Sequence, residues 1–148
     1  MQTKLLQEGE ASTWALVFDS GDQVMAPLAA FAQEQGLAAS EFAAIGAFEK
    51  ATLGYFNLER RAYDQIPVDQ QVELLSLIGH VTREPSGQPN IHAHVVLGKK
   101  DGAAVGGHLV EAVVRPTLEI ILTESPAHLR RRKDPQTGLA LIDLAASS

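Results

Sequence analysis

Short apolar runs rich in β-forming residues recur along the chain, and they predict strands more often than helices; apolar and polar positions alternate in residues 51–58. Strands are expected over residues 12–18, 51–58, 72–81, 109–114, 117–123 and 137–144. Helical spacing occurs in residues 24–35, where the apolar positions are Val24, Leu28, Phe31 and Ala32. We therefore predict one main helix, capped by Asp22 and ended by Gly36.

Residues 40–50 admit two interpretations, a helix or a buried strand. The run from Phe42 to Phe48 is apolar throughout, so periodicity does not decide between them. Gly46 in its middle favours a strand with a bulge or a close approach of backbones. Residues 59–67 and 82–89 are expected to be connections, the first because it is polar and the second because it is rich in proline and glycine.

Together these elements predict a single compact α/β domain of the α+β type. A central, mostly antiparallel sheet is expected, flanked by one main helix. The length suits one hydrophobic core, and no repeat or linker divides the chain. The domain is expected to span residues 1–148, with its core over about 12–144.

Three of the five histidines lie in residues 90–109, which read as two strands joined by a tight turn. His92 and His94 are two positions apart, so they point to the same face of a strand. The length of the turn decides whether His108, on the second strand, joins them.

Two turns are compatible with the sequence. Residues 100–102 fit a three-residue loop whose last residue is a left-handed glycine, and this loop places His94 opposite His108. A two-residue turn at 101–102 would instead place His108 beside Val95 on the other face and separate the rings.

In the first register, His92, His94 and His108 share one face and can occupy three corners of a tetrahedron. The fourth corner is then left to water or substrate, as in catalytic zinc sites. We therefore predict a site for zinc or another divalent metal. The alternative is that a His-x-His pair is simply polar and lies on an exposed face of the sheet.

Glu73 and Glu111 are the candidate catalytic bases. Glu73 is the one charged residue of 72–78. A carboxylate among apolar strand residues either points to solvent or has a role in a functional site. His80, near a strand end, is a further candidate ligand or an ordinary surface residue. His128 is expected to be solvated.

Composition narrows the function classes. The formal net charge is −6, which does not favour binding to polyanions such as nucleic acid. The basic run at 130–133 either touches phosphates, is solvated, or meets an acidic surface of a neighbouring subunit. Cysteine is absent, which excludes disulfides, thiolate catalysis and cysteine-based zinc sites. Without a membrane-length apolar run or a signal peptide, a cytoplasmic protein is expected.

Three motifs together resemble the PPC (plant and prokaryote conserved) domain. They are Ala-Ile-Gly-Ala-Phe at 44–48, Val-Glu-Leu-Leu-Ser-Leu-Ile-Gly at 72–79, and the block from His92 to Leu109 with His-x-His and Gly-Gly-His-Leu. The resemblance covers about residues 13–144. It implies a central antiparallel sheet with a flanking helix, and assembly as a homotrimer.

For stand-alone prokaryotic members, the resemblance also implies a metal site at His92, His94 and His108. Glu73 matches the acidic position of the second motif, without an implied role. The Arg-Gly-Arg-Pro core of an AT-hook is absent here, so direct DNA binding is not expected.

Three functions remain as hypotheses. The first is a homotrimeric metalloprotein whose open coordination position supports hydrolysis. The second is a DNA-associated regulatory or assembly module. The third is a sensor that binds a small molecule at the histidines or between subunits.

Overall fold

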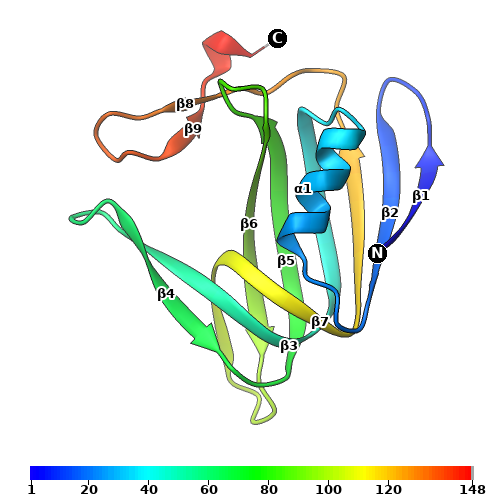
Figure 1. Cartoon of the computed structure of the whole chain (residues 1–148), viewed down its shortest axis with the longest axis vertical. Helices are drawn as coiled ribbons and strands as arrows, with labels where there is room; N and C mark the ends of the chain where they lie inside the picture. Colours follow the sequence, from blue (N-terminus) through cyan, green and yellow to red (C-terminus); the bar gives the residue numbers. More distant parts are fainter. Residues whose placement is uncertain (148) are drawn as a thin grey trace.

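One curved antiparallel sheet of seven strands forms the body of the computed structural model, which describes residues 1–147 (Figure 1). The strand order is β1-β2-β7-β6-β5-β3-β4. A separate two-stranded sheet, β8-β9, and a short 3-10 helix, η1, follow near the C-terminus. The elements are β1 (Gln2–Gln7), β2 (Ser12–Asp19), α1 (Met25–Glu34), β3 (Ala39–Asn57), β4 (Ala62–Val68), β5 (Val72–Arg83), β6 (Pro89–Gly98), β7 (Ala104–Glu124), β8 (Arg131–Lys133), β9 (Ala140–Ile142) and η1 (Leu144–Ala146).

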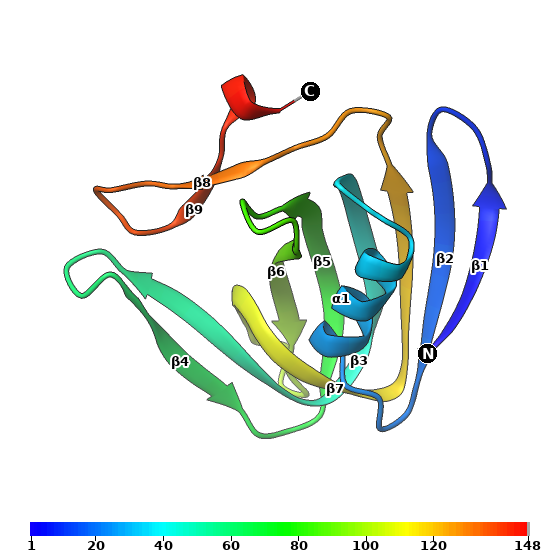
Figure 2. The ribbon, with the colours of Figure 1, turned by 45° about the horizontal axis from the view of Figure 1, so that its top comes forward.

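The sheet closes on itself because β3 and β7 are long enough to pair at both ends. Residues 117–124 of β7 lie between β2 and the first half of β3. Residues 104–108 of β7 pair with β6, and residues 108–114 pair with the second half of β3. The circuit β3–β5–β6–β7 therefore curls around a concave side, and α1 lies against it (Figure 2).

The core fills the concave side, between the sheet and α1. Leu28, Phe31 and Ala32 of the helix are buried there together with apolar residues of the strands. Burying a leucine or phenylalanine side chain contributes about 1.5–3 kcal/mol. Every second residue of a strand points inward, so the intervening residues, including the histidines of β6, lie on the outer face. Within residues 1–147 no helix combines the length and apolar character needed to cross a membrane.

The predicted fold class is confirmed, as are the main helix and the strands over 12–18 and 72–81. Residues 40–50 belong to β3, which settles the open choice in favour of a strand. The register of β3 against β5 shifts between Ala44 and Gly46, as the bulge interpretation requires. Gly46 has φ 152°, and a Cβ there would collide with the backbone of Thr117 and Leu118.

Several boundaries differ from the predictions. Residues 59–67 are not a mere connection, because β4 pairs with β3 over Ala62–Val68. β4 is an edge strand with one buried residue, Val68, so it carries no apolar alternation. Residues 109–114 and 117–123 form one strand, β7, and β1 was not predicted. The expected strand over 137–144 is reduced to β9 and η1.

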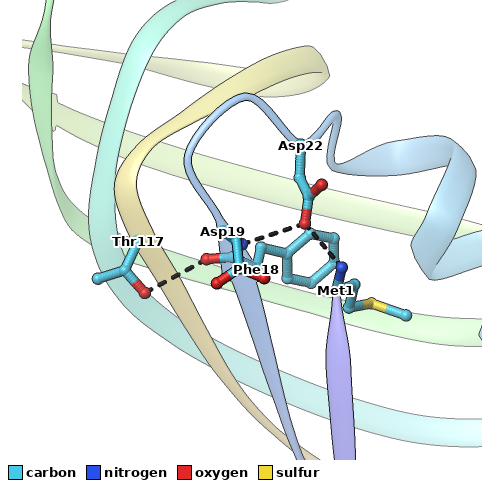
Figure 3. A network of polar contacts seen from close by, with 5 residues as sticks. All are labelled: Met1, Phe18, Asp19, Asp22 and Thr117. Carbon is cyan, nitrogen blue, oxygen red and sulfur yellow. Dashed lines mark hydrogen bonds and ion pairs between the residues drawn. The ribbon is translucent and has the colours of Figure 1, made fainter.

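The prediction that Asp22 caps the helix is wrong. Its carboxylate accepts hydrogen bonds from the Met1 ammonium at 2.8 Å and from the Asp19 N–H at 3.1 Å (Figure 3). Nearby, the Thr117 hydroxyl donates a hydrogen bond to the Phe18 carbonyl (Figure 3). This bond links the end of β2 to the second half of β7.

The close approach at Gly46 gives a first prediction. Gly46→Ala should destabilise the protein by about 2–4 kcal/mol, because it adds a methyl group against backbone and keeps a φ that side chains disfavour. Urea unfolding measures this loss. Gly9→Ala is the control, since a Cβ there meets nothing within 4 Å, and its effect should stay within about 0.5 kcal/mol. Equal stability of the two variants would contradict the prediction.

Candidate metal centre

The turn between β6 and β7 is the three-residue loop expected from the sequence. The Lys99 N–H donates to the Ala103 carbonyl at 2.8 Å, and Gly102 has φ 83°. His94 is therefore paired with His108 across the hairpin. The two-residue alternative, which would have separated the rings, does not occur.

His92, His94 and His108 converge on the outer face of the sheet. The Nε2 atoms of His92 and His94 are 3.1 Å apart, and one nitrogen from each of the three rings lies within 4.8 Å of the others. Two nitrogens bound to one tetrahedral zinc at 2.0–2.1 Å would be roughly 3.3 Å apart. The rings thus need only small adjustments to bind one ion.

The environment keeps two of these imidazoles in the neutral form that binds metals. Burial lowers the pKa of His92 to about 4, and the positive charge of Arg131 adds to this effect. Burial also lowers the pKa of His108 from its ordinary value, with a smaller contribution from His94. Two of the three rings are therefore uncharged at neutral pH.

His108 is held by stacking rather than by hydrogen bonds. The Tyr63 ring of β4 stacks on it with a centroid distance of 4.7 Å and an interplanar angle of 28°. Gly54 makes room for this tyrosine, because a Cβ there would lie 2.7 Å from its Cδ1. The Nδ1 atom of His108 is buried without a hydrogen-bond partner among the described residues. Since buried polar atoms normally have a partner, this nitrogen is suited to a ligand.

The donor set and the unpaired nitrogen both fit a divalent metal of the zinc type. Three neutral imidazoles are a common set of zinc ligands, and a fourth position remains for water or a ligand. Among the described residues, the histidines form the one group of three or more His, Cys, Asp or Glu side chains that converge in this way.

Two hollows lie on either side of the histidines. The large hollow, of about 570 Å³, is mainly apolar, and its lining includes Glu41, Ala43, Ile78, His80, His94 and Ile121. The small hollow, of about 240 Å³, has a lining that includes Tyr63, Asn90, His92, His108, Arg131 and Leu141. His92 lines both hollows, so the ring group is reachable from two directions.

The structure does not bring Glu73 or Glu111 into the histidine group. Glu111 lies at the start of α1, where its Oε1 accepts hydrogen bonds from the Val24, Met25 and Ala112 N–H groups. It therefore performs the helix capping expected of Asp22. Glu73 is exposed near the start of β5, paired with Ala47 and Gly98, and it lines neither hollow.

The remaining histidines and the basic run are placed as follows. His80 is paired with His92 across β5 and β6 and lines the large hollow, while His128 is exposed. Arg131 is only 7% exposed, so solvation does not describe the whole basic run. Its Nε donates to the Thr82 hydroxyl at 2.7 Å and its Nη1 to the Ala140 carbonyl at 2.6 Å. Nothing in the sequence distinguished Arg131 from its basic neighbours.

These features define a class of protein, namely a small α+β domain that presents three convergent imidazoles on the outer face of a closed antiparallel sheet. The sequence profile of the Plants and Prokaryotes Conserved (PCC) domain matches residues 6–126, and the chain belongs to this family. The resemblance read from the three motifs is thus confirmed.

Solved structures agree with this assignment. A plant- and prokaryote-conserved protein from Pyrococcus horikoshii is 33% identical, with a TM-score of 0.82 over 96% of this chain and 94% of that one. A metal-containing protein from Archaeoglobus fulgidus is 33% identical, with a TM-score of 0.81 over 96% of each chain. A proposed DNA-binding protein from Bacteroides thetaiotaomicron is 25% identical, with a TM-score of 0.85 over 97% of this chain and 98% of that one. No protein of curated function matches the sequence.

The lowered pKa of His92 predicts how stability depends on pH. Between about 6.5, the value in an unfolded chain, and about 4, the unfolded chain binds a proton that the native protein does not. The metal-free protein should therefore lose stability as the pH falls through this range. Urea unfolding at pH 7 and pH 5, after treatment with a chelator, measures the loss.

Two variants assign that loss to its source. His92→Asn should reduce it, whereas His128→Asn, which changes an exposed histidine outside the group, should leave it unaltered. If His92→Asn loses as much stability on acidification as the unmodified protein, the buried imidazole is not the cause.

Proposed function

We propose that this PCC-domain protein binds a divalent metal, preferably zinc, through His92, His94 and His108. We propose further that the protein uses this metal to bind or hydrolyse a small molecule. The observation that carries the proposal is the 3.1 Å separation of two Nε2 atoms, with the third ring close by. The metal-containing relative from Archaeoglobus fulgidus supports it.

Each part of the site has a distinct role in this proposal. The three rings supply nitrogen donors, and burial lowers the pKa values of His92 and His108. Tyr63 fixes the orientation of His108 by stacking. A divalent ion held this way supplies a Lewis acid and lowers the pKa of bound water. The two hollows give a small molecule access to the open coordination position.

The metal content of the protein tests this proposal. Protein purified without an affinity tag should contain, or take up on titration, about one zinc per chain. His94→Gln should weaken zinc binding at least about tenfold, because one of three donors is lost. His128→Gln is the matched control and should retain the affinity. Elemental analysis and calorimetry measure both quantities, and a protein that neither contains nor takes up metal would refute the site.

We further propose that the protein assembles with itself as a homotrimer, as the sequence resemblance implies. A row of paired residues crosses the outer face in the order Ile121, Ala43, Ile78, His94 and His108. Ile78 is 61% exposed and Ile121 50%, and exposed apolar patches of this kind mark contact surfaces. A second copy suits this face because the apolar row runs directly into the histidine group.

The oligomeric state tests the assembly. The unmodified protein should sediment with the mass of three chains, and Ile45→Glu, which places a charge on the same face, should dissociate it. Leu58→Glu is the control, since Leu58 is as exposed as Ile45 but lies in the turn after β3. A monomeric unmodified protein, or an undisturbed Ile45→Glu trimer, would overturn this proposal.

The DNA-associated alternative has less support. It draws on the proposed DNA-binding relative and on the basic run. The net charge of −6 opposes it, and the guanidinium of Arg131 is engaged with Thr82 and Ala140.

A further inference from the structure

The small hollow is built from parts of the chain that are far apart in sequence. His92 and His108 come from the β6–β7 hairpin, and Tyr63 comes from β4. The opposite wall is the β8–β9 hairpin, with Arg131, Ala140 and Leu141. Figures 1 and 2 show the β8–β9 hairpin and the turn between β3 and β4 on the same side of the molecule, with the β8–β9 hairpin near the start of β6.

Arg131 is unusual because its charge is buried without an ion pair among the described residues. Its hydrogen bonds go to a hydroxyl and a carbonyl, both uncharged, and no carboxylate of residues 1–147 forms an ion pair with it. Buried charges are costly unless they are paired. Burial accordingly lowers the pKa of Arg131, and the carboxylate of Glu84 offsets this only from a distance. Glu84 Oε1 instead accepts a hydrogen bond from Asn90 Nδ2 at 2.9 Å.

A metal ion at the histidines would add a second positive charge beside this hollow. Two cations facing one space repel each other unless an anion lies between them. A guanidinium has five N–H donors in a planar fork, and only Nε and Nη1 of Arg131 have partners in the described residues. The fork matches the geometry of a carboxylate.

We propose that the small hollow binds the carboxylate of a small organic acid, which Arg131 recognises while the acid reaches the metal held by His92 and His108. This inference rests on the proposed metal site and names the class of its ligand. The volume of about 240 Å³ suits an acid of a few carbon atoms, because pockets for drug-sized ligands measure about 300–1,000 Å³. Ile91, Leu139 and Leu141 line the same hollow and provide apolar contacts for the carbon chain. This apolar lining favours a carboxylic acid over inorganic phosphate.

Anion titration of the cobalt-loaded protein tests the inference. The visible absorption of Co²⁺ reports changes in coordination, and calorimetry reports binding. Sodium propionate and butyrate should each produce a saturable change at pH 7, whereas chloride at the same ionic strength should not. Inorganic phosphate should bind more weakly than either acid. If phosphate alone saturates the site, or if no anion does, the inference fails.

Variants of the β8–β9 wall test the role of Arg131. Arg131→Met should weaken propionate binding about 10- to 100-fold, as expected for loss of a charged hydrogen-bonding partner, while cobalt affinity is retained. Arg132→Met is the matched control, because Arg132 is exposed and pairs with Asp143, and it should change propionate affinity less than about twofold. Equal propionate affinity in Arg131→Met and the unmodified protein would refute the inference.

Two further measurements apply if Arg131→Met does not fold or if the protein takes up no metal. If Arg131→Met does not fold, Leu141→Trp fills the hollow from a half-exposed position and should weaken butyrate binding more than formate binding. An equal effect on both acids would refute the inference. If the protein takes up no cobalt, the proposed metal site fails. Calorimetry with the metal-free protein then decides whether Arg131 binds propionate by itself, and absence of binding refutes the inference independently.

Discussion

The length of one turn determines whether this protein has a histidine group at all. Side chains of a strand alternate between its faces, so a change of one residue in the β6–β7 pairing would send His108 into the core. The hydrogen bond from Lys99 N–H to the Ala103 carbonyl fixes the three-residue loop, and the pairing of His94 with His108 follows from it. The position of His108 on the outer face is therefore set by a turn about 20 Å away along the hairpin. This distance corresponds to roughly six strand residues.

The closure of the sheet gives the site its second property, which is partial burial. Because β3 pairs with β7 at both ends, the β3–β4 hairpin is brought to the outer face and Tyr63 covers His108. Burial costs more free energy for a protonated imidazole than for a neutral one, so it favours the neutral form. The neutral form is the one that can bind a metal. The same closure explains the position of Glu111, whose strand passes the start of α1 and supplies its cap.

Sequence patterns were sufficient where one local rule dominates. An apolar run with few polar members predicted β5, glycine at a strand interior predicted the bulge at Gly46, and turn chemistry predicted the hairpin register. They failed where tertiary contacts decide: β4 is an edge strand with one buried residue, and Arg131 is buried where its side chain meets Thr82 of β5 and Ala140 of β9. The stacking of Tyr63 likewise depends on the absence of a side chain at Gly54, from a neighbouring strand.

The β8–β9 hairpin lies beyond residue 126, where the match to the family profile ends, yet it forms one wall of the small hollow. It joins the rest of the molecule through a few contacts, among them the Arg83 N–H to Leu129 carbonyl bond and the Arg131 bond to Thr82. The three imidazoles come from β6 and β7, which lie outside this segment. Relatives can therefore diverge in this terminal segment, and change the lining of the small hollow, while keeping the histidine hairpin unaltered.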